Sequence, residues 1–250
     1  HEGTSAGRTV LNPVPNELIT LQGEVRQAFG WSLDADDSSA MEMEKCFSEP
    51  HPFGQEAWSI ESRKAALLSL KQSICSAERL VIIGAGSESI QTHQYPGAKF
   101  VAADGAVGAL DDLSRVLCVV SDGDGAEHLE RAARHGIHIV LHAHGDNADI
   151  WKHIASKWAN FDSPPPLTLT YQSMKQYDGM YNPGGFTDGD RALCLIRALG
   201  RSLDAVECIG FRTDYVGPWS GTTDPLRKKQ KLRWMEESMR RLGVEHHLIN

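Results

Sequence analysis

The sequence has few cysteines, and none of them are paired at metal-binding or redox spacing. Its five cysteines form no CxxC pair, and four of them lie in apolar segments, where a thiol behaves as a small hydrophobic group. Such a pattern is typical of a protein in a reducing compartment. It argues against a secreted fold held together by disulfides.

The sequence also lacks an excess of positive charge and any long apolar run. Its formal charge of −8 argues against nucleic acids and anionic membranes as partners, because binding either needs a positive field. No apolar run reaches the roughly 18 residues of a membrane helix, and the first residues lack the basic-then-apolar order of a signal peptide. We expect a cytoplasmic protein with small-molecule ligands, and a homodimer as the commonest oligomer.

Length and composition are enough for one large domain with an extension. The chain has 250 residues, of which 41% are hydrophobic. Residues 1–55 are predicted to be an accessory segment, with a helix from Leu18 to Phe29 followed by an acidic loop from Asp34 to Ser39. Residues 56–250 are predicted to form an α/β catalytic domain.

Short apolar runs alternate with polar or helical stretches from residue 79 onward, as in a mainly parallel, Rossmann-like sheet with helices on both faces. Helices are expected at 57–77, from Asp188, and at 225–242, and a last strand-like segment at 244–249. The predicted strands are 80–83, 100–103, 116–120, 137–141, 167–171 and 205–209. Several polar loops directly follow these strands and should converge at the carboxyl edge of the sheet, where ligands bind.

The first of these loops is Gly84-Ala-Gly-Ser-Glu-Ser89. Two glycines after a strand let a backbone approach phosphates, as in dinucleotide-binding folds. Ser89 stands where the third glycine of that fingerprint would be, so the motif is incomplete. We therefore expect Gly84, Gly86 and Ser87 to line a phosphate, with a plain tight turn as the alternative.

The loop Ser121-Asp-Gly-Asp-Gly125 carries two carboxylates two residues apart. Neighbouring carboxylates repel each other unless a cation lies between them, and hard oxygen ligands suit Mg²⁺. A solvated turn would have the same composition. The position of Asp122 and Asp124 directly after a predicted central strand favours the metal site.

The loop His142-Ala-His-Gly-Asp-Asn147 allows two interpretations. It matches a zinc-hydrolase HxHxDH motif except that Asn147 replaces the last histidine, which weakens that interpretation. Alternatively, Asp146, Asp149 and Lys152 lie on one side of a starting helix, with carboxylates for a metal and an ammonium for a phosphate.

Glycines precede another predicted helix start, in Gly184-Gly-Phe-Thr-Asp-Gly-Asp-Arg191. Thr187 and Arg191 could bind an anion there, although capping alone would explain Thr187 and Asp188. The basic run Arg227-Lys-Lys-Gln-Lys231 is more typical of a solvated helix face.

Five segments occur in an order that resembles a known family, the archaeal MptE-like 6-hydroxymethyl-7,8-dihydropterin pyrophosphokinases, which are related to thiamine pyrophosphokinases. The resemblance covers about residues 79 to 232. Gly123 stands where the family usually has a leucine, but both flanking aspartates are kept. The segments are Val101-Ala-Ala-Asp-Gly-Ala106, Val120-Ser-Asp-Gly-Asp-Gly125, His142-Ala-His-Gly-Asp-Asn147, Gly185-Phe-Thr-Asp-Gly-Asp-Arg-Ala192 and Lys228-Lys-Gln-Lys-Leu232.

The resemblance implies an archaeal source, a thiamine-pyrophosphokinase-like core, and transfer of diphosphate from ATP to a reduced pterin with Mg²⁺ as cofactor. The pterin product would enter tetrahydromethanopterin or folate biosynthesis. The resemblance also selects the second interpretation of the histidine loop, in which Asp146, Asp149 and Lys152 bind a metal and a phosphate. The implied metal ligands are Asp122, Asp124, Asp146 and Asp149, of which the first three are also catalytic with Lys152. The implied nucleotide contacts are Gly84, Gly86, Ser87, Asp149, Gly185, Thr187 and Arg191, and the implied substrate contacts are Asp104, Asn147 and Asp188.

Three alternatives remain open at this point. The acceptor could be thiamine, as in the related superfamily. A zinc metallohydrolase would use His142, His144 and Asp146. A non-catalytic nucleotide-binding module would bind ATP without releasing AMP.

Overall fold

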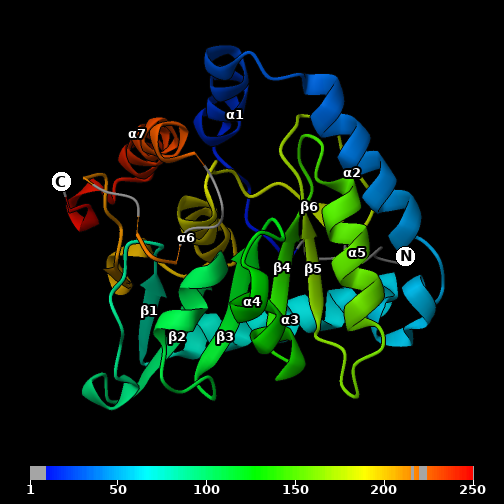
Figure 1. Ribbon diagram of the computed structural model, residues 1–250, viewed down its shortest axis with the longest axis horizontal. Coiled ribbons are helices and arrows are strands. Elements are labelled where there is room, and N and C mark those ends of the chain that lie inside the picture. The colour runs from blue at the N-terminus through cyan, green and yellow to red at the C-terminus, as the bar shows by residue number, and fades with distance from the viewer. Residues whose placement is uncertain (1–9, 215–216, 220–223, 250) are drawn as a thin grey trace, which may run out of the picture.

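A parallel sheet forms the centre of the protein (Figure 1). The computed structural model describes residues 10–214, 217–219 and 224–249. Within them, seven strands pair in the order β6-β5-β4-β3-β2-β1-β7, and every pairing is parallel. The strands are β1 Arg79–Ile83, β2 Ala98–Ala103, β3 Val116–Ser121, β4 His138–His142, β5 Leu167–Thr170, β6 Met180–Tyr181 and β7 Glu207–Ile209.

Alternate residues of each strand enter two separate cores, because successive side chains point to opposite faces of a sheet. In β1, Val81 and Ile83 join the core on one face, while Leu80 and Ile82 join the core on the other. All four are buried. A sheet covered on both faces explains why its strands are continuous apolar runs.

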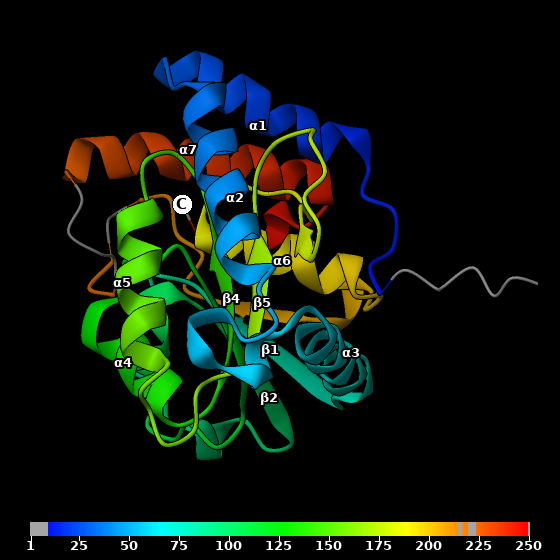
Figure 2. The same ribbon diagram turned by 90° about the vertical axis from the view of Figure 1, so that its right-hand side faces the viewer.

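Helices cover both faces of the sheet (Figure 2). Residues of α2, α4 and α5 contribute to one core, and residues of α3, α6 and α7 contribute to the other. None of the described helices is long and apolar enough to cross a membrane. The helices are α1 Asn16–Phe29, α2 Leu33–Phe47, α3 Ile60–Ser76, α4 Ala126–Arg134, α5 Ala148–Trp158, α6 Asp188–Ala198 and α7 Pro225–Leu242.

The α/β prediction is confirmed, and all six predicted strands are present. Two local predictions are wrong. The acidic stretch from Asp34 lies inside α2, because Ser32 caps that helix and carboxylates in its first turn complement the helix dipole. The segment 244–249 is a short helical turn with a single β-bridge at Ile249, because Val244 is buried against the core instead of pairing with a strand.

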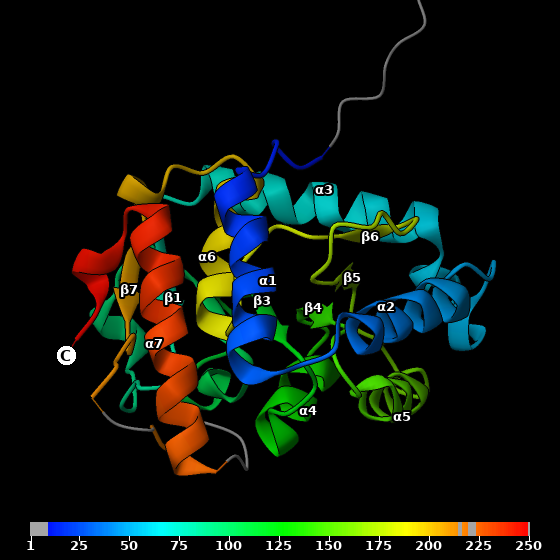
Figure 3. The same cartoon turned by 90° about the horizontal axis from the view of Figure 1, so that it is seen from above.

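The first helices lie against the carboxyl edge of the sheet. Seen from above, α1 lies beside α7, while α2 lies beside α5 (Figure 3). Side-chain hydrogen bonds fix this arrangement: Gln22 of α1 bonds Asn182, and Ser39 of α2 bonds Asn147. The loops that follow the strands therefore face helices from the first fifty residues.

Candidate active site

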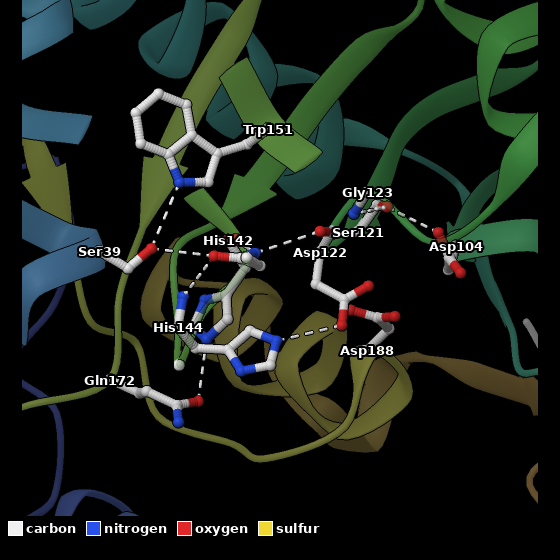
Figure 4. A network of polar contacts seen from close by, with 12 residues as sticks. Ser39, Asp104, Ser121, Asp122, Gly123, His142, His144, Trp151, Gln172 and Asp188 are labelled. Atoms are coloured by element: carbon white, nitrogen blue, oxygen red, sulfur yellow. Dashed lines mark hydrogen bonds and ion pairs between the residues drawn. The ribbon is translucent and has the colours of Figure 1, made fainter. Parts of the chain in front are cut away.

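Three carboxylates converge at the carboxyl edge of the sheet (Figure 4). Asp104 follows β2, Asp122 follows β3, and Asp188 is the first residue of α6. One oxygen from each lies within 4.8 Å of the others. Parallel topology accounts for the meeting, because β2 and β3 are neighbours and end at the same edge.

Asp104 is held in place by the end of β3. Its backbone φ is 49°, in the left-handed region that non-glycine residues rarely adopt, and such strain is typical of functional positions. The buried hydroxyl of Ser121 donates to Asp104 Oδ1 over 2.6 Å and accepts from the Gly123 N–H over 2.8 Å. Burial raises the pKa of Asp104 to about 7, and the charge of Asp122 adds to the shift.

Asp122 is positioned by the histidine loop that follows β4. His144 Nε2 donates to Asp122 Oδ2 over 3.2 Å, and the Asn147 side chain donates to the Asp122 carbonyl. Burial opposes ionisation, but the bond from His144 and the charge of Arg191 hold the pKa of Asp122 well below its usual range. Its other oxygen, Oδ1, is buried and accepts no hydrogen bond from the described residues.

Asp188 and Arg191 lie in the first turn of α6, where Thr187 and Asp190 form a capping box. Arg191 Nη2 lies 3.1 Å from Asp188 Oδ1, close enough for an ion pair but without hydrogen-bond geometry, so that oxygen accepts no bond. Burial, followed by the charge of Asp122, raises the pKa of Asp188 well above its usual range. Arg191 is only 6% exposed, yet its Nε and Nη1 have no partner among the described residues.

This cluster fits a hard divalent cation. It offers carboxylate oxygens from three separate elements, and two of them, Asp122 Oδ1 and Asp188 Oδ1, are buried without a hydrogen bond. Buried carboxylate oxygens normally have a partner, so these two call for a ligand. Oxygen-only sites of this kind suit Mg²⁺.

The zinc interpretation has no geometric support. His142 is buried, and both ring nitrogens are occupied: Nδ1 contacts Thr170 Oγ1 over 2.8 Å, and Nε2 contacts Gln172 Oε1 over 2.9 Å. Burial lowers the pKa of His142 well below its usual value. Asp146 is exposed and belongs to no metal-competent group among the described residues.

The other residues predicted from the sequence to bind ligands are exposed or engaged in contacts outside the carboxylate cluster. Asp146 and Asp149 are exposed at the start of α5, and Lys152 pairs with Glu42 of α2. The Asn147 side chain is engaged with Ser39, His142 and the Asp122 carbonyl, so it holds loops together. The Ser87 hydroxyl donates to the Gly84 carbonyl of its own turn and to the Ile209 carbonyl at the end of β7.

Two cavities meet at the cluster. Asp104, Thr187, Asp188 and Lys228 line both of them. One cavity, of about 50 Å³, is bordered by backbone from Gly84, Gly86, Gly210 and Gly217. The other, of about 60 Å³, is bordered by Trp31, Asp122, Asp124, His144, Gln172, Phe186, Arg191 and Lys231. Chemical groups that enter the two cavities would therefore meet over the carboxylates.

Several residues of these walls were not predicted from the sequence. Lys228 and Lys231 belong to the basic run that was interpreted as a solvated face, and Trp31 lies in the predicted accessory segment. Helical spacing offered one signal, because Lys228 lies three residues before Lys231 and four residues before the buried Leu232, which places all three on one side of a helix. Nothing in the sequence indicated Trp31.

The cluster predicts how the metal-free protein responds to pH. The pKa of Asp104 is about 7 in the folded protein and roughly 3.9 in an unfolded chain. The folded state thus binds the extra proton, and stability present at low pH is lost as pH rises from about 4 to about 7, by at most about 4 kcal/mol.

Asp104→Asn should remove this loss. We expect chemical denaturation to show a difference in the free energy of unfolding, variant minus metal-free wild type, that increases as pH rises from about 4 to about 7. Asp146→Asn, on the exposed side of the loop, serves as the control. A difference between Asp104→Asn and the wild type that stays constant with pH would contradict the assignment.

Comparison with known proteins places the chain among pyrophosphokinases. It is 32% identical to the 6-hydroxymethyl-7,8-dihydropterin pyrophosphokinase of Pyrococcus furiosus, over 69% of this chain and 71% of the relative. The chain belongs to that family. A second relative of the same name, from Methanothermobacter thermautotrophicus, is 38% identical over 55% of this chain and 63% of the relative. No family model matches the chain.

Membership in this family means that the chain is a diphosphotransferase. The predicted resemblance is therefore confirmed. A group-transfer enzyme needs two substrates to meet at one reacting atom, and two cavities that share the carboxylate cluster provide such a place.

Proposed function

We propose that this pyrophosphokinase transfers the β,γ-diphosphate of ATP to the hydroxymethyl group of 6-hydroxymethyl-7,8-dihydropterin, giving AMP and the pterin diphosphate. The observation that carries the proposal is the carboxylate cluster at the junction of two cavities, in a chain of this family. In the reaction, a bond forms between the hydroxymethyl oxygen and the β-phosphorus. The bond from that phosphorus to the oxygen of AMP breaks, and the hydroxyl proton is released.

The glycine-lined cavity suits the nucleotide. Its wall near Ser87 is backbone: a side chain at Gly210, where φ is 78°, would lie 2.4 Å from the Ser87 amide nitrogen. Gly84 and Gly86 in turn approach the Gly210 carbonyl. These glycines let the two loops pack backbone against backbone, so that main-chain groups are left at the cavity wall to face the phosphates.

The second cavity suits a flat heteroaromatic acceptor. Trp31 and Phe186 supply an aromatic wall, with ring centroids 6.0 Å apart, and Gln172 and His144 supply polar edges. Pockets for small ligands combine apolar walls with a few polar groups in this way. An acceptor here would direct its hydroxymethyl group toward the carboxylates that both cavities share.

Asp104, Asp122 and Asp188 would hold Mg²⁺, and the exposed Asp124 lines the same cavity. Bound there, the ion would neutralise charge on the transferred phosphates and align them for in-line displacement. Arg191 has two free donors for phosphate oxygens, and the amino end of α6 adds its dipole. Phosphoryl transfer needs mainly such positioning and charge stabilisation.

Other assignments from the sequence stay predictions. Asp146 and Asp149 as metal ligands and Lys152 as a phosphate ligand require side chains that are exposed or paired with Glu42 in this structure. Asn147 as a substrate contact, a cytoplasmic location, a homodimer, and a place in tetrahydromethanopterin or folate biosynthesis likewise stay predictions.

The acceptor is tested by AMP release. Purified protein is incubated with ATP and Mg²⁺ and with the reduced pterin, with thiamine, or without an acceptor. We expect AMP only with the pterin. Release of AMP with thiamine alone would identify thiamine as the acceptor instead of the pterin. Binding of ATP without release of AMP with either acceptor would contradict catalysis of this reaction.

A further inference from the structure

Two lysines of α7 line the cavities around the carboxylate cluster, and neither pairs with a carboxylate of the described residues. Lys228 lines both cavities and Lys231 lines the aromatic one. Both are half-buried, whereas Lys229 between them is exposed. A spacing of three residues places Lys228 and Lys231 on one side of the helix.

These lysines have no ion pair among the described residues. Every contact up to 4.0 Å between a basic and an acidic side chain in that part of the chain involves other residues. Lys231 instead lies over the Trp31 ring, 5.6 Å from its centroid. Burial, followed by the charge of Lys228, lowers the pKa of Lys231, so its ammonium has lost hydration without gaining a carboxylate.

Arg191 is a second, independent sign of a missing anion. It lines the same cavity as Lys231, it is 6% exposed, and its Nε and Nη1 have no partner among the described residues. Buried guanidinium donors are normally satisfied. Three cationic side chains from two helices thus line one cavity, and none of them has all of its hydrogen-bond donors paired among the described residues.

The cavity is positively charged once a divalent cation is bound, even with all of its carboxylates ionised. Its walls carry four aspartates, which are Asp104, Asp122, Asp124 and Asp188, against Arg191, Lys228 and Lys231. One divalent ion outweighs the single excess negative charge, so the metal-loaded cavity is positive. A positive, half-buried cavity attracts a polyanion.

We propose that Lys228 and Lys231 of α7, together with Arg191, bind the diphosphate that is transferred. This inference rests on the proposed function. Lys228 lies at the wall shared by both cavities, where the β-phosphorus must pass from nucleotide to acceptor. Lys231 lies on the acceptor side only and holds the far end of the group. Together they oppose the carboxylates across the phosphates.

The test measures binding of a diphosphate without any acceptor. Inorganic pyrophosphate is titrated into the full chain with Mg²⁺ by calorimetry, for the wild type, Lys228→Ala, Lys231→Ala, the double variant, and Lys229→Ala as the matched control. We expect the Kd to rise about tenfold for each single variant and about a hundredfold for the double, since each loses a charged hydrogen bond. Lys229→Ala should stay within about twofold of the wild type.

The outcomes separate this inference from the proposed function. A double variant that binds pyrophosphate like the wild type, or a wild type that binds none, overturns the role of the two lysines even if the pterin is diphosphorylated. A wild type whose pyrophosphate binding depends on both lysines, but which forms no AMP with the pterin, supports the diphosphate site and overturns the acceptor. Lys228→Arg and Lys231→Arg should restore most of the binding, which a purely structural role would not require.

Discussion

Asp122→Asn is expected to lower kcat about 1,000-fold while leaving the fold intact. Asp122 is the centre of the carboxylate cluster: its charge shifts the pKa of Asp104, Asp124 and Asp188, and its Oδ1 accepts no hydrogen bond from the described residues. An amide keeps the shape but loses the charge that binds the ion. A contribution of about 4 kcal/mol to the barrier corresponds to that factor.

The control for this variant is Asp146→Asn. Asp146 was predicted from the sequence to be a metal ligand, but its side chain is exposed and outside the cluster. Steady-state kinetics at saturating Mg²⁺ should show Asp146→Asn within about threefold of the wild type. If Asp146→Asn loses as much turnover as Asp122→Asn, the histidine loop supplies the metal ligand and the carboxylate cluster is wrongly assigned.

Asp188→Asn should give the second-largest effect, and it should appear in the Mg²⁺ dependence. The sequence resemblance implied a substrate contact for Asp188, whereas one of its carboxylate oxygens lies within 4.8 Å of oxygens of Asp104 and Asp122. We expect the Mg²⁺ concentration for half-maximal activity to rise at least tenfold and kcat to fall about a hundredfold, the loss of about 3 kcal/mol from the barrier.

The two roles of Asp188 leave different kinetic signatures. A metal ligand changes the Mg²⁺ requirement and leaves the KM of the acceptor nearly constant once Mg²⁺ saturates. A substrate contact raises the KM of the acceptor at every Mg²⁺ concentration. A tenfold rise in that KM with an unchanged Mg²⁺ requirement would remove Asp188 from the metal site.

The sheet could be predicted from the sequence because buried parallel strands leave a local signal. Each predicted strand is a continuous apolar run that supplies residues to two cores, and the polar loops follow directly from where these runs end. Parallel topology then places the loops after β2 and β3 at one edge. The approach of Asp104 to Asp122 was therefore within reach of the sequence.

The composition of the metal cluster was not within reach, because it depends on distant elements. Asp188 comes from α6, which packs across β1, β2 and β3 after a long connection. In contrast, Asp146 and Asp149 had the right spacing for one helix face, but the start of α5 leaves both exposed. Spacing along a helix says which residues share a side, and not which side faces the site.

The first fifty residues gave the least information in the sequence. The structure brings Trp31 to the cavity because α1 and α2 are tied to the core: Arg26 donates to the Gln172 carbonyl and pairs with Asp36, and the Asp36 side chain accepts from the Gly145 N–H. The contacts with Gln172 and Gly145 join residues more than a hundred positions apart. Local patterns carry no trace of them.

The most direct test of the proposed function is the identity of the products. The chain is incubated with ATP, Mg²⁺ and 6-hydroxymethyl-7,8-dihydropterin, and the products are identified by mass and phosphorus resonance. Transfer at the β-phosphorus predicts AMP and the pterin diphosphate in equal amounts. Formation of ADP with a pterin monophosphate, or of no phosphorylated pterin at all, would contradict it.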